Sequence, residues 1–232
     1  MPSSDDNSLN SIYEKKVEKR AENLIQRHQQ HLTPYSVELK NLTLQMQPNV
    51  FCAAYADGSQ LLADVVAQEV QIEDLVLDMG TGSGAMAIIA AQYCKKVVAV
   101  DISPIAVDCA RNNATINHVA DRVEVRQGNL FDAVKAEEKF SLIVFNPPFM
   151  DGSPSDLLET AMYDRDYLTL KQFFSEFPKF LKPDGRLLIV FSEAGDIQLL
   201  ESLILQSGMK SEVVKSDLPK EYNLKVLTYK LS

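Results

Sequence analysis

The chain has 232 residues, 46% of them hydrophobic and 24% charged, as expected of one soluble globular domain with a sizeable core. No apolar run approaches the ~20 residues that cross a bilayer, and the polar N-terminus lacks the apolar core of a secretory signal, so we expect a cytoplasmic protein with no membrane partner. The net charge of −9 makes nucleic acid a less favoured partner, without excluding it.

The first fifty residues are predicted to form an extension before the main domain. The first ten are polar and are expected to be disordered. Apolar residues recur at helical spacing over residues 12–32, which predicts a helix that stops before the next proline. Its basic residues, Arg20 and Arg27 among them, are interleaved with glutamates, which favours a solvent-exposed helix face. Apolar residues over 37–46 then predict a short strand or hairpin.

Residues 51–232 are predicted to form one α/β domain, because apolar strands alternate with helices. Predicted helices cover residues 61–70, 83–93, 104–117, 167–181 and 197–206. Predicted strands cover residues 75–79, 96–100, 122–126, 140–145, 186–191, 212–215 and 224–230. These seven strands should form a mostly parallel, doubly wound, Rossmann-like sheet. The last two strands lack an intervening helix, which predicts an antiparallel strand at the C-terminus.

A glycine-rich loop follows the first strand of this sheet. Gly80, Gly82 and Gly84 allow the sharp turns and the close approach to a ligand that a nucleotide site needs. The next strand ends at Asp101, 21 residues after Gly80, where a carboxylate can accept hydrogen bonds from a ribose diol. Loop, strand and terminal acid together predict a cofactor that contains a nucleoside.

A second turn, Asn146-Pro147-Pro148-Phe149, follows the strand at 140–145. Two consecutive prolines fix φ and remove two backbone donors, so the turn is rigid and presents oxygen acceptors. The Asn146 amide and the neighbouring Phe149 ring suit a flat group that carries an NH2, such as a nucleobase amine or a carboxamide.

The ordered motifs resemble those of class I S-adenosylmethionine (SAM) methyltransferases. The matching segments are Asp78-Met-Gly-Thr-Gly-Ser-Gly84, Val98-Ala-Val-Asp101, Gly128-Asn-Leu-Phe131 and Asn146-Pro-Pro-Phe149. More narrowly, they are similar to the amino-methyltransferases with an Asn-Pro-Pro-Phe/Tyr turn, which include release-factor glutamine methyltransferases and several RNA base methyltransferases. The resemblance covers roughly residues 57–232 and implies that residues 51–232 are a SAM-dependent catalytic domain.

The resemblance implies a set of residues around the cofactor. The glycines would contact the methionine part, Asp101 the ribose and Ile102 the adenine. Asn129 stands where the family often has an aspartate, and its carbonyl oxygen can still accept from the adenine amine. The predicted cofactor-binding set is Asp78, Gly80, Thr81, Gly82, Gly84, Asp101, Ile102, Asn129, Leu130 and Asn146.

The acceptor side is predicted around the proline turn. As a hypothesis, the Asn146 side-chain oxygen and the Pro147 carbonyl accept the two N–H hydrogens of the acceptor nitrogen, while Phe149 stacks on its planar group. These three residues are the predicted catalytic set. The predicted substrate-binding set is Tyr55, Asp57, Pro148, Phe149 and Arg165. Ser59 is a further candidate in the segment that enters the pocket.

These residues predict methyl transfer to a planar amino or amide nitrogen of a protein glutamine, a nucleobase or a small molecule. Two alternatives stay open. The spacing Gly80-x-Gly82-x-x-Ala85 also fits a dinucleotide site, which would suit an NAD-dependent oxidoreductase. A noncatalytic binding module could keep the same fold. Three scattered cysteines with no CxxC pair predict no metal site.

Overall fold

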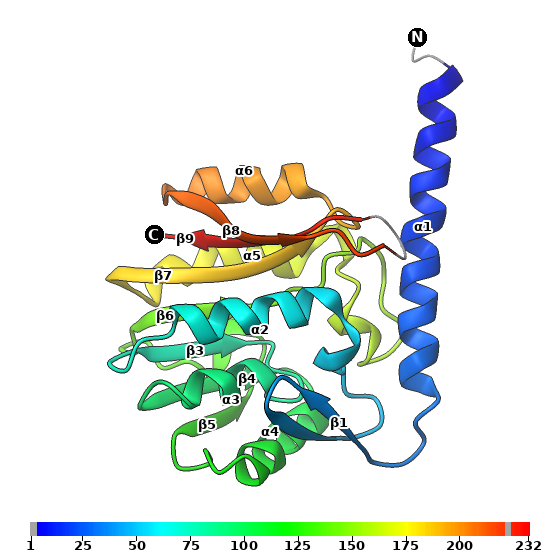
Figure 1. Ribbon diagram of the computed structural model, residues 1–232. Helices are drawn as coiled ribbons and strands as arrows, with labels where there is room; N and C mark the ends of the chain where they lie inside the picture. The colour runs from blue at the N-terminus through cyan, green and yellow to red at the C-terminus, as the bar shows by residue number, and fades with distance from the viewer. Residues whose placement is uncertain (1–3, 221–223) are drawn as a thin grey trace.

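The computed structural model describes residues 4–220 and 224–232 and builds one large sheet, a hairpin and flanking helices (Figure 1). The strands are β1 Tyr35–Leu39, β2 Leu42–Met46, β3 Leu75–Met79, β4 Lys96–Asp101, β5 Val123–Gln127, β6 Phe140–Phe145, β7 Leu181–Ser192, β8 Ser211–Asp217 and β9 Val226–Leu231. The α-helices are α1 Ser4–Gln29, α2 Asp57–Glu69, α3 Ala85–Ala91, α4 Pro104–Ile116, α5 Leu168–Glu176 and α6 Ile197–Ser207.

The main sheet has seven strands in the order β5-β4-β3-β6-β7-β9-β8. The first five of these pair in parallel, and β9 runs antiparallel to both of its neighbours. The predicted Rossmann-like fold with an antiparallel C-terminal strand is therefore confirmed. From β3, the strands that follow in the chain are added first on one side, as β4 and β5, and then on the other, as β6 and β7. This change of side opens a crevice at the carboxyl ends of β3 and β6.

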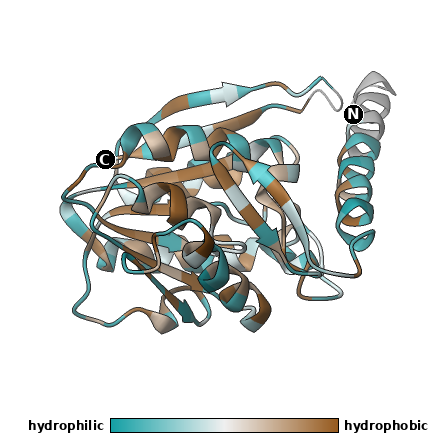
Figure 2. Cartoon of the chain, turned by 60° about the horizontal axis from the view of Figure 1, so that its bottom comes forward, coloured by the Kyte–Doolittle hydropathy of each residue, from teal (hydrophilic) through white to brown (hydrophobic). Residues whose placement is uncertain are grey.

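Alternate residues of each central strand feed two separate cores, since successive side chains of a strand point to opposite faces. On β6, Leu142 and Val144 pack under α2, α3 and α4, whereas Ile143 and Phe145 pack against α5 and α6. Figure 2 shows the central strands largely in the brown of hydrophobic residues, with helices of mixed colour around them. Burial on both faces explains the nearly continuous apolar sequences of the parallel strands.

The predicted hairpin is confirmed as β1 and β2, which pair antiparallel. It is tied to the main domain because the Gln45 N–H donates to Asn113 Oδ1 of α4 at 2.8 Å, and Asn117 Nδ2 donates to the Thr43 carbonyl at 2.9 Å. The predicted disordered tail was wrong from Ser4 onward, because α1 begins there; residues 1–3 lie outside the described residues.

Two further boundaries differ from prediction for local reasons. Helix α5 ends at Glu176 and a 3₁₀ turn follows, because Pro178 cannot continue the α-helical hydrogen bonds. The segment 182–185 falls between the helix predicted over 167–181 and the strand predicted over 186–191. In the structure it lies inside β7 as an irregularity, since Phe140 pairs with Leu181 but Leu142 pairs with Arg186. Ser103 caps helix α4, because its Oγ accepts from the Ala106 N–H.

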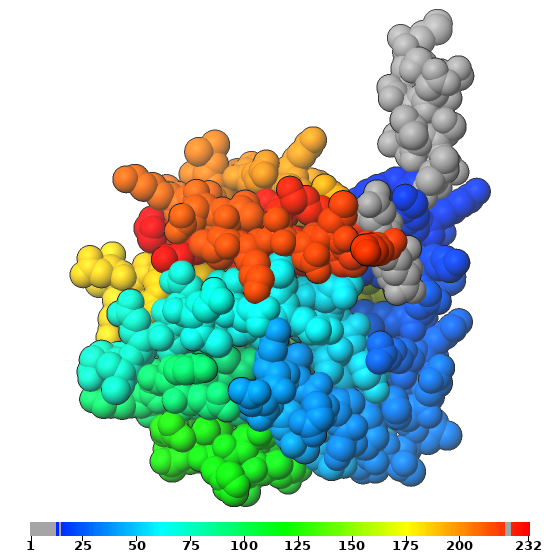
Figure 3. All heavy atoms as spheres, viewed as in Figure 1, coloured from blue at the N-terminus to red at the C-terminus, as the bar shows by residue number. Residues whose placement is uncertain are grey.

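Helix α1 lies along the side of the main domain rather than in either core (Figures 1 and 3). A third apolar cluster joins it to the segment that follows the proline turn, and its buried members are Ala21, Met150, Leu158, Met162, Ala194 and Leu224. Consequently α1 covers the carboxyl-end edge of the sheet, where the two predicted site loops emerge.

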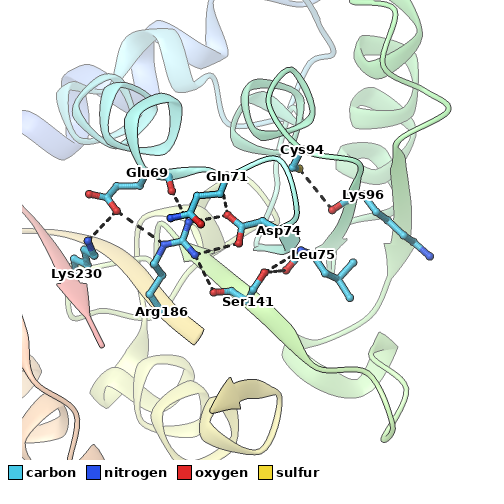
Figure 4. A network of polar contacts seen from close by, with 9 residues as sticks. All are labelled: Glu69, Gln71, Asp74, Leu75, Cys94, Lys96, Ser141, Arg186 and Lys230. Carbon is cyan, nitrogen blue, oxygen red and sulfur yellow. Dashed lines mark hydrogen bonds and ion pairs between the residues drawn. The ribbon is translucent and has the colours of Figure 1, made fainter. Parts of the chain in front are cut away.

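The opposite edge of the sheet carries an ion network (Figure 4). Two guanidinium nitrogens of Arg186 donate to the two carboxylate oxygens of Asp74 at 3.1 and 2.7 Å. Arg186 also donates to the carbonyls of Glu69 and Ser141, and Lys230 pairs with the Glu69 carboxylate at 2.9 Å. The network joins α2, β3, β6, β7 and β9 far from the proline turn, so its role is structural.

Two further findings bear on broad class. Within residues 4–220 and 224–232, none of the helices combines the length and the apolar character that a bilayer crossing requires. Over the same residues, no group of three or more His, Cys, Asp or Glu side chains is arranged to hold a metal ion.

Candidate active site

The glycine loop and the proline turn leave the sheet side by side. Strands β3 and β6 pair in parallel with Asp78 opposite Val144 and Met79 opposite Phe145. The residues that follow, Gly80 and Asn146, therefore emerge from adjacent strands at the same edge. This adjacency is the spatial condition on which the predicted chemistry depends, and the sheet order satisfies it.

Local hydrogen bonds hold the glycine loop open. Gly80, Gly82 and Gly84 have φ values of +65°, +55° and +85°, which side chains with a Cβ rarely adopt. The buried Asp78 carboxylate accepts from Thr81 Oγ1 at 2.5 Å and from the Ala87 N–H at 3.0 Å. Asp78 thus shapes the loop and the start of α3.

Asp101, at the end of β4, forms part of the same loop structure. Its two carboxylate oxygens accept from the Gly82 N–H at 2.8 Å and from the Ser103 N–H at 2.9 Å. Burial raises the pKa of Asp78 to about 7, against the lowering effect of its hydrogen bonds to Thr81 and Ala87, and nearby Asp101 adds to the rise. Burial also raises the pKa of Asp101. Two carboxylates in one crevice create a site that favours a cation.

A cavity of about 290 Å³, the glycine-loop cavity, lies over this loop. Most of the predicted cofactor-binding residues line it, namely Asp78, Gly80, Thr81, Gly82, Asp101, Ile102, Asn129, Leu130 and Asn146. Gly84 does not; a Cβ there would lie 3.0 Å from Ala110 Cβ, so it permits α3 to pack against α4. Pro148 and the exposed Arg165, predicted for the substrate, also line this cavity.

A second cavity of about 260 Å³, the α1 cavity, lies between α1, the start of α2 and the proline turn. The predicted residues that line it are Tyr55, Asp57, Asn146, Pro147 and Phe149. Four residues, Phe51, Ser59, Asn146 and Ala161, line both cavities. The two spaces therefore meet at Asn146, and the structure brings most of the predicted site residues together around that contact.

A hydrogen bond orients Asn146 at this junction. Its Nδ2 donates to Oγ of the buried Ser59 at 3.0 Å. With the amide nitrogen directed at Ser59, Oδ1 is the group left to accept a hydrogen bond from a ligand. Sequence reasoning singled out Ser59 only for its neighbourhood; its bond to a residue 87 positions away is visible only in the fold.

The sequence profile of the methyltransferase small domain matches residues 41–217, which include the parallel strands and every residue that lines the glycine-loop cavity. The α1 residues that line the α1 cavity lie before this range. The chain belongs to the methyltransferase small domain family. The predicted resemblance to class I methyltransferases of the Asn-Pro-Pro-aromatic group is thereby confirmed.

Two curated relatives and one solved structure illustrate the range of this family. A Methanocaldococcus jannaschii protein, named as a candidate N5-glutamine methyltransferase, is 33% identical over 76% of this chain and 89% of its own. The Porphyromonas gingivalis tRNA1(Val) (adenine(37)-N6)-methyltransferase is 34% identical over 49% of this chain and 48% of its own. The structure of the Thermus thermophilus 16S rRNA N2 G1207 methyltransferase superimposes with a TM-score of 0.64 at 22% identity, covering 84% of this chain and 49% of that one.

The chain spans only 29% to 48% of the length of several of its curated relatives. The family match begins at residue 41, so helix α1 lies outside it.

Helix α1 contributes residues that the sequence analysis placed in solvent. Arg20 is 9% exposed; it donates to Ser192 Oγ at 3.1 Å and lies 3.8 Å from the Asp57 carboxylate and 5.8 Å from the centre of the Phe149 ring. The predicted solvent-exposed face was wrong for this arginine, because helical spacing alone does not show which face docks on the domain.

His28, also on α1, is buried. Its Nδ1 lies 2.7 Å from the Leu24 carbonyl, and its Nε2 accepts from the Cys52 N–H at 2.7 Å. This arrangement requires the proton on Nδ1 and pins α1 to the segment that lines both cavities. Burial lowers the pKa of His28 and the nearby Arg27 lowers it further, against the raising effect of the hydrogen bond to the Leu24 carbonyl.

Gly195, after β7, supports the proline turn of this methyltransferase small domain. A Cβ at Gly195 would overlap the Phe149 carbonyl oxygen. We expect Gly195→Ala to displace the turn and to lower kcat about 10²-fold, since catalytic groups tolerate little misplacement. The matched control is Gly208→Ala, where nothing lies within 4 Å and only the φ of +73° is strained. Equal kcat values for the two variants would show that Gly195 is not needed to keep the proline turn in place.

Proposed function

We propose that this chain is a SAM-dependent N-methyltransferase that acts on a planar amino or amide nitrogen. The observation that carries the proposal is the junction at Asn146, where the glycine-loop cavity meets the α1 cavity beside the proline turn. A cofactor in one cavity and an acceptor in the other would bring their reacting atoms to the same side chain.

The charges of the glycine-loop cavity support SAM as its ligand. SAM carries a positive sulfonium and a positive ammonium. In the described part of the chain, no Lys, Arg or His lies within ion-pair distance of Asp78 or Asp101. A cationic ligand would therefore offset the electrostatic cost of burying these two carboxylates. The positive-φ glycines give the ligand room to approach the backbone.

We assign the chemistry of transfer to the proline turn. When bound, SAM supplies a methyl group on a positively charged sulfur. Asn146 Oδ1, oriented by Ser59, and the Pro147 carbonyl accept the two N–H hydrogens of the acceptor, which aims its nitrogen lone pair. Both oxygens also stabilise the positive charge that develops on that nitrogen as the methyl–sulfur bond would break, and the nitrogen would then lose one proton to solvent. Phe149 lies on the α1 cavity and packs against the planar group.

Relatives with this fold act on different acceptors. One is named for the N5 nitrogen of glutamine and another for the N6 nitrogen of a tRNA adenine. Both nitrogens are planar and carry N–H groups, so both suit the acceptors at Asn146 and Pro147. We propose residues 51–232 as the catalytic domain and residues 1–50 as the extension that completes the acceptor side. A cytoplasmic location stays a prediction.

Asp78 predicts how SAM binding depends on pH. Its pKa of about 7 means that the cavity gains a negative charge as the pH rises through neutrality, and a cation binds the ionised form better. Calorimetry should therefore show SAM affinity rising about tenfold between pH 6 and pH 8. Asp78→Asn, whose amide oxygen can still accept from Thr81, should flatten this dependence. A pH-independent affinity in the unaltered protein would contradict the assignment.

Two measurements test the proposed function itself. Calorimetry with SAM separates an enzyme from a noncatalytic module, and fluorescence titration with NADH exposes an oxidoreductase. Transfer of tritiated methyl groups from SAM into a fractionated lysate then identifies the acceptor class as protein, RNA or small molecule. Binding of NADH without binding of SAM, or the absence of labelled product in every fraction, would overturn the proposal.

A further inference from the structure

The α1 cavity has a cationic wall. Arg20 and Arg27 line it from the same face of α1, since seven residues make two helical turns. The third charged residue among its lining residues is Asp57, which faces Arg20 at 3.8 Å. The excess positive charge of this cavity therefore rests with Arg27, although the chain as a whole carries a net charge of −9.

Arg27 is held in place without a carboxylate. Its guanidinium carbon lies 3.7 Å from the centre of the Tyr55 ring, and Tyr55 is fixed in turn by a 2.9 Å hydrogen bond between its hydroxyl and His31 Nε2. In the part of the chain that the structure describes, no Asp or Glu side chain lies within 4.0 Å of Arg27. Stacking uses the face of a guanidinium and leaves its edge of N–H donors to bind an oxyanion.

Aromatic side chains line the rest of this cavity. Phe51, Tyr55 and Phe149 all border it, with Asn146 at its inner end. A glutamine side chain is neutral and narrow, so it offers nothing to Arg27 and little to three rings. A nucleotide offers a flat base with an exocyclic amine, and a phosphate at some distance from that amine.

We propose that the α1 cavity binds a nucleotide as the methyl acceptor, with the amine of the base at Asn146 and the phosphate at Arg27. This inference rests on the proposed function, because it names the substrate of the same site. The base lies between Asn146 and the Phe149 ring. The guanidinium of Arg27 binds the phosphate oxygens. Arg20, held by Asp57 and Ser192, contacts the Phe149 ring and so positions it.

The surroundings favour a free nucleotide or a short strand over a long one. Glu18, Glu22 and Glu159 lie near Tyr163, which borders the glycine-loop cavity. Burial raises the pKa of the Tyr163 hydroxyl most, and these three carboxylates raise it further. A long polyanion that crossed this region would be repelled. A single phosphate beside Arg27 would meet less of this repulsion than a long strand, because it carries fewer negative charges.

Calorimetry tests the inference with the glycine-loop cavity saturated by S-adenosylhomocysteine, so that nucleosides cannot bind there. The probes are adenosine, cytidine and guanosine with their 5′-monophosphates, and uridine monophosphate, which has no exocyclic amine. At least one amine-bearing monophosphate should bind about tenfold or more tightly than its nucleoside, as expected for a charge-assisted hydrogen bond to Arg27. Uridine monophosphate should bind more weakly than that nucleotide.

Variants assign the preference to Arg27. Arg27→Gln should bring the affinity ratio of monophosphate to nucleoside close to one, and Arg27→Lys should give an intermediate ratio. The matched control is Arg111→Gln, an exposed arginine on α4 outside both cavities, which should keep the ratio of the unaltered protein. Circular dichroism melting confirms that each variant is folded. If Arg27→Gln is not folded, Arg27→Lys takes its place as the test variant.

Other outcomes would overturn the inference. They are equal binding of nucleotide and nucleoside, a preference that persists in Arg27→Gln, or binding of an acidic glutamine peptide where no nucleotide binds. Comparing the best mononucleotide with a trinucleotide that contains it distinguishes the free molecule from a strand. Methyl transfer into a peptide would leave the proposed function intact while overturning this inference, whereas failure to bind SAM or S-adenosylhomocysteine would overturn the proposed function itself.

Discussion

Asn146→Ala should lower kcat for methyl transfer about 10²- to 10³-fold while changing the affinity for SAM only a few-fold. The substitution removes Oδ1, the oxygen that is proposed to accept a hydrogen bond from the nitrogen to be methylated. This hydrogen bond orients the nitrogen and stabilises the charge that develops on it. The glycine loop and Asp101, which form most of the cofactor side, stay in place. Single-turnover rates with saturating SAM, together with calorimetric SAM affinities, measure the two effects separately.

Two further variants sharpen this prediction. Ser59→Ala removes the hydrogen bond that orients Asn146 but keeps Oδ1, so its loss in kcat should be smaller than that of Asn146→Ala. Asn112→Ala, at an exposed position of α4, is the matched control and should leave kcat unchanged. Equal losses of SAM affinity and kcat in Asn146→Ala would assign this residue to the cofactor instead of the acceptor.

Arg186→Met should lower the free energy of unfolding by about 3–5 kcal/mol, since it leaves the Asp74 carboxylate buried without its partner. The side chains of Arg186 and Asp74 are only 11% and 5% exposed, and the guanidinium binds the carboxylate through two nitrogens. The network of Figure 4 also ties Arg186 to the Glu69 carbonyl at the end of α2. Urea unfolding monitored by circular dichroism measures the loss, with an unchanged m-value as the sign of a two-state comparison.

The matched control for Arg186 is an ion pair in solvent. Lys95 and Glu73 lie 2.9 Å apart with side chains 69% and 76% exposed, so Lys95→Met should cost less than about 1 kcal/mol. SAM affinity should be unchanged in Arg186→Met under conditions where it is folded, because the network lies at the opposite edge of the sheet from the glycine loop. Similar stability losses for both variants would show that burial does not set the strength of the Arg186 pair.

Sequence alone predicted the features that depend on neighbouring residues. Alternating apolar strands and helices require a parallel sheet, and a glycine loop after one strand must share an edge with a turn after the adjacent strand. The sequence did not predict which strands are neighbours; the pairing of β3 with β6 in the structure shows that Gly80 and Asn146 follow adjacent strands. Helix ends were less accurate, as at Glu176, because local caps and prolines compete with the apolar pattern.

The acceptor side was decided by tertiary structure. The bond from Asn146 to Ser59 joins residues 87 apart, and that from Arg20 to Ser192 joins residues 172 apart. The spacing of charges along α1 does not reveal which face is covered, because this depends on the shape of the surface that it meets. Chain order and periodicity thus determined the strands, the helices and the position of the glycine loop after a strand. The docking of α1 placed Arg27 at the α1 cavity, since only packing between distant segments selects one helix face.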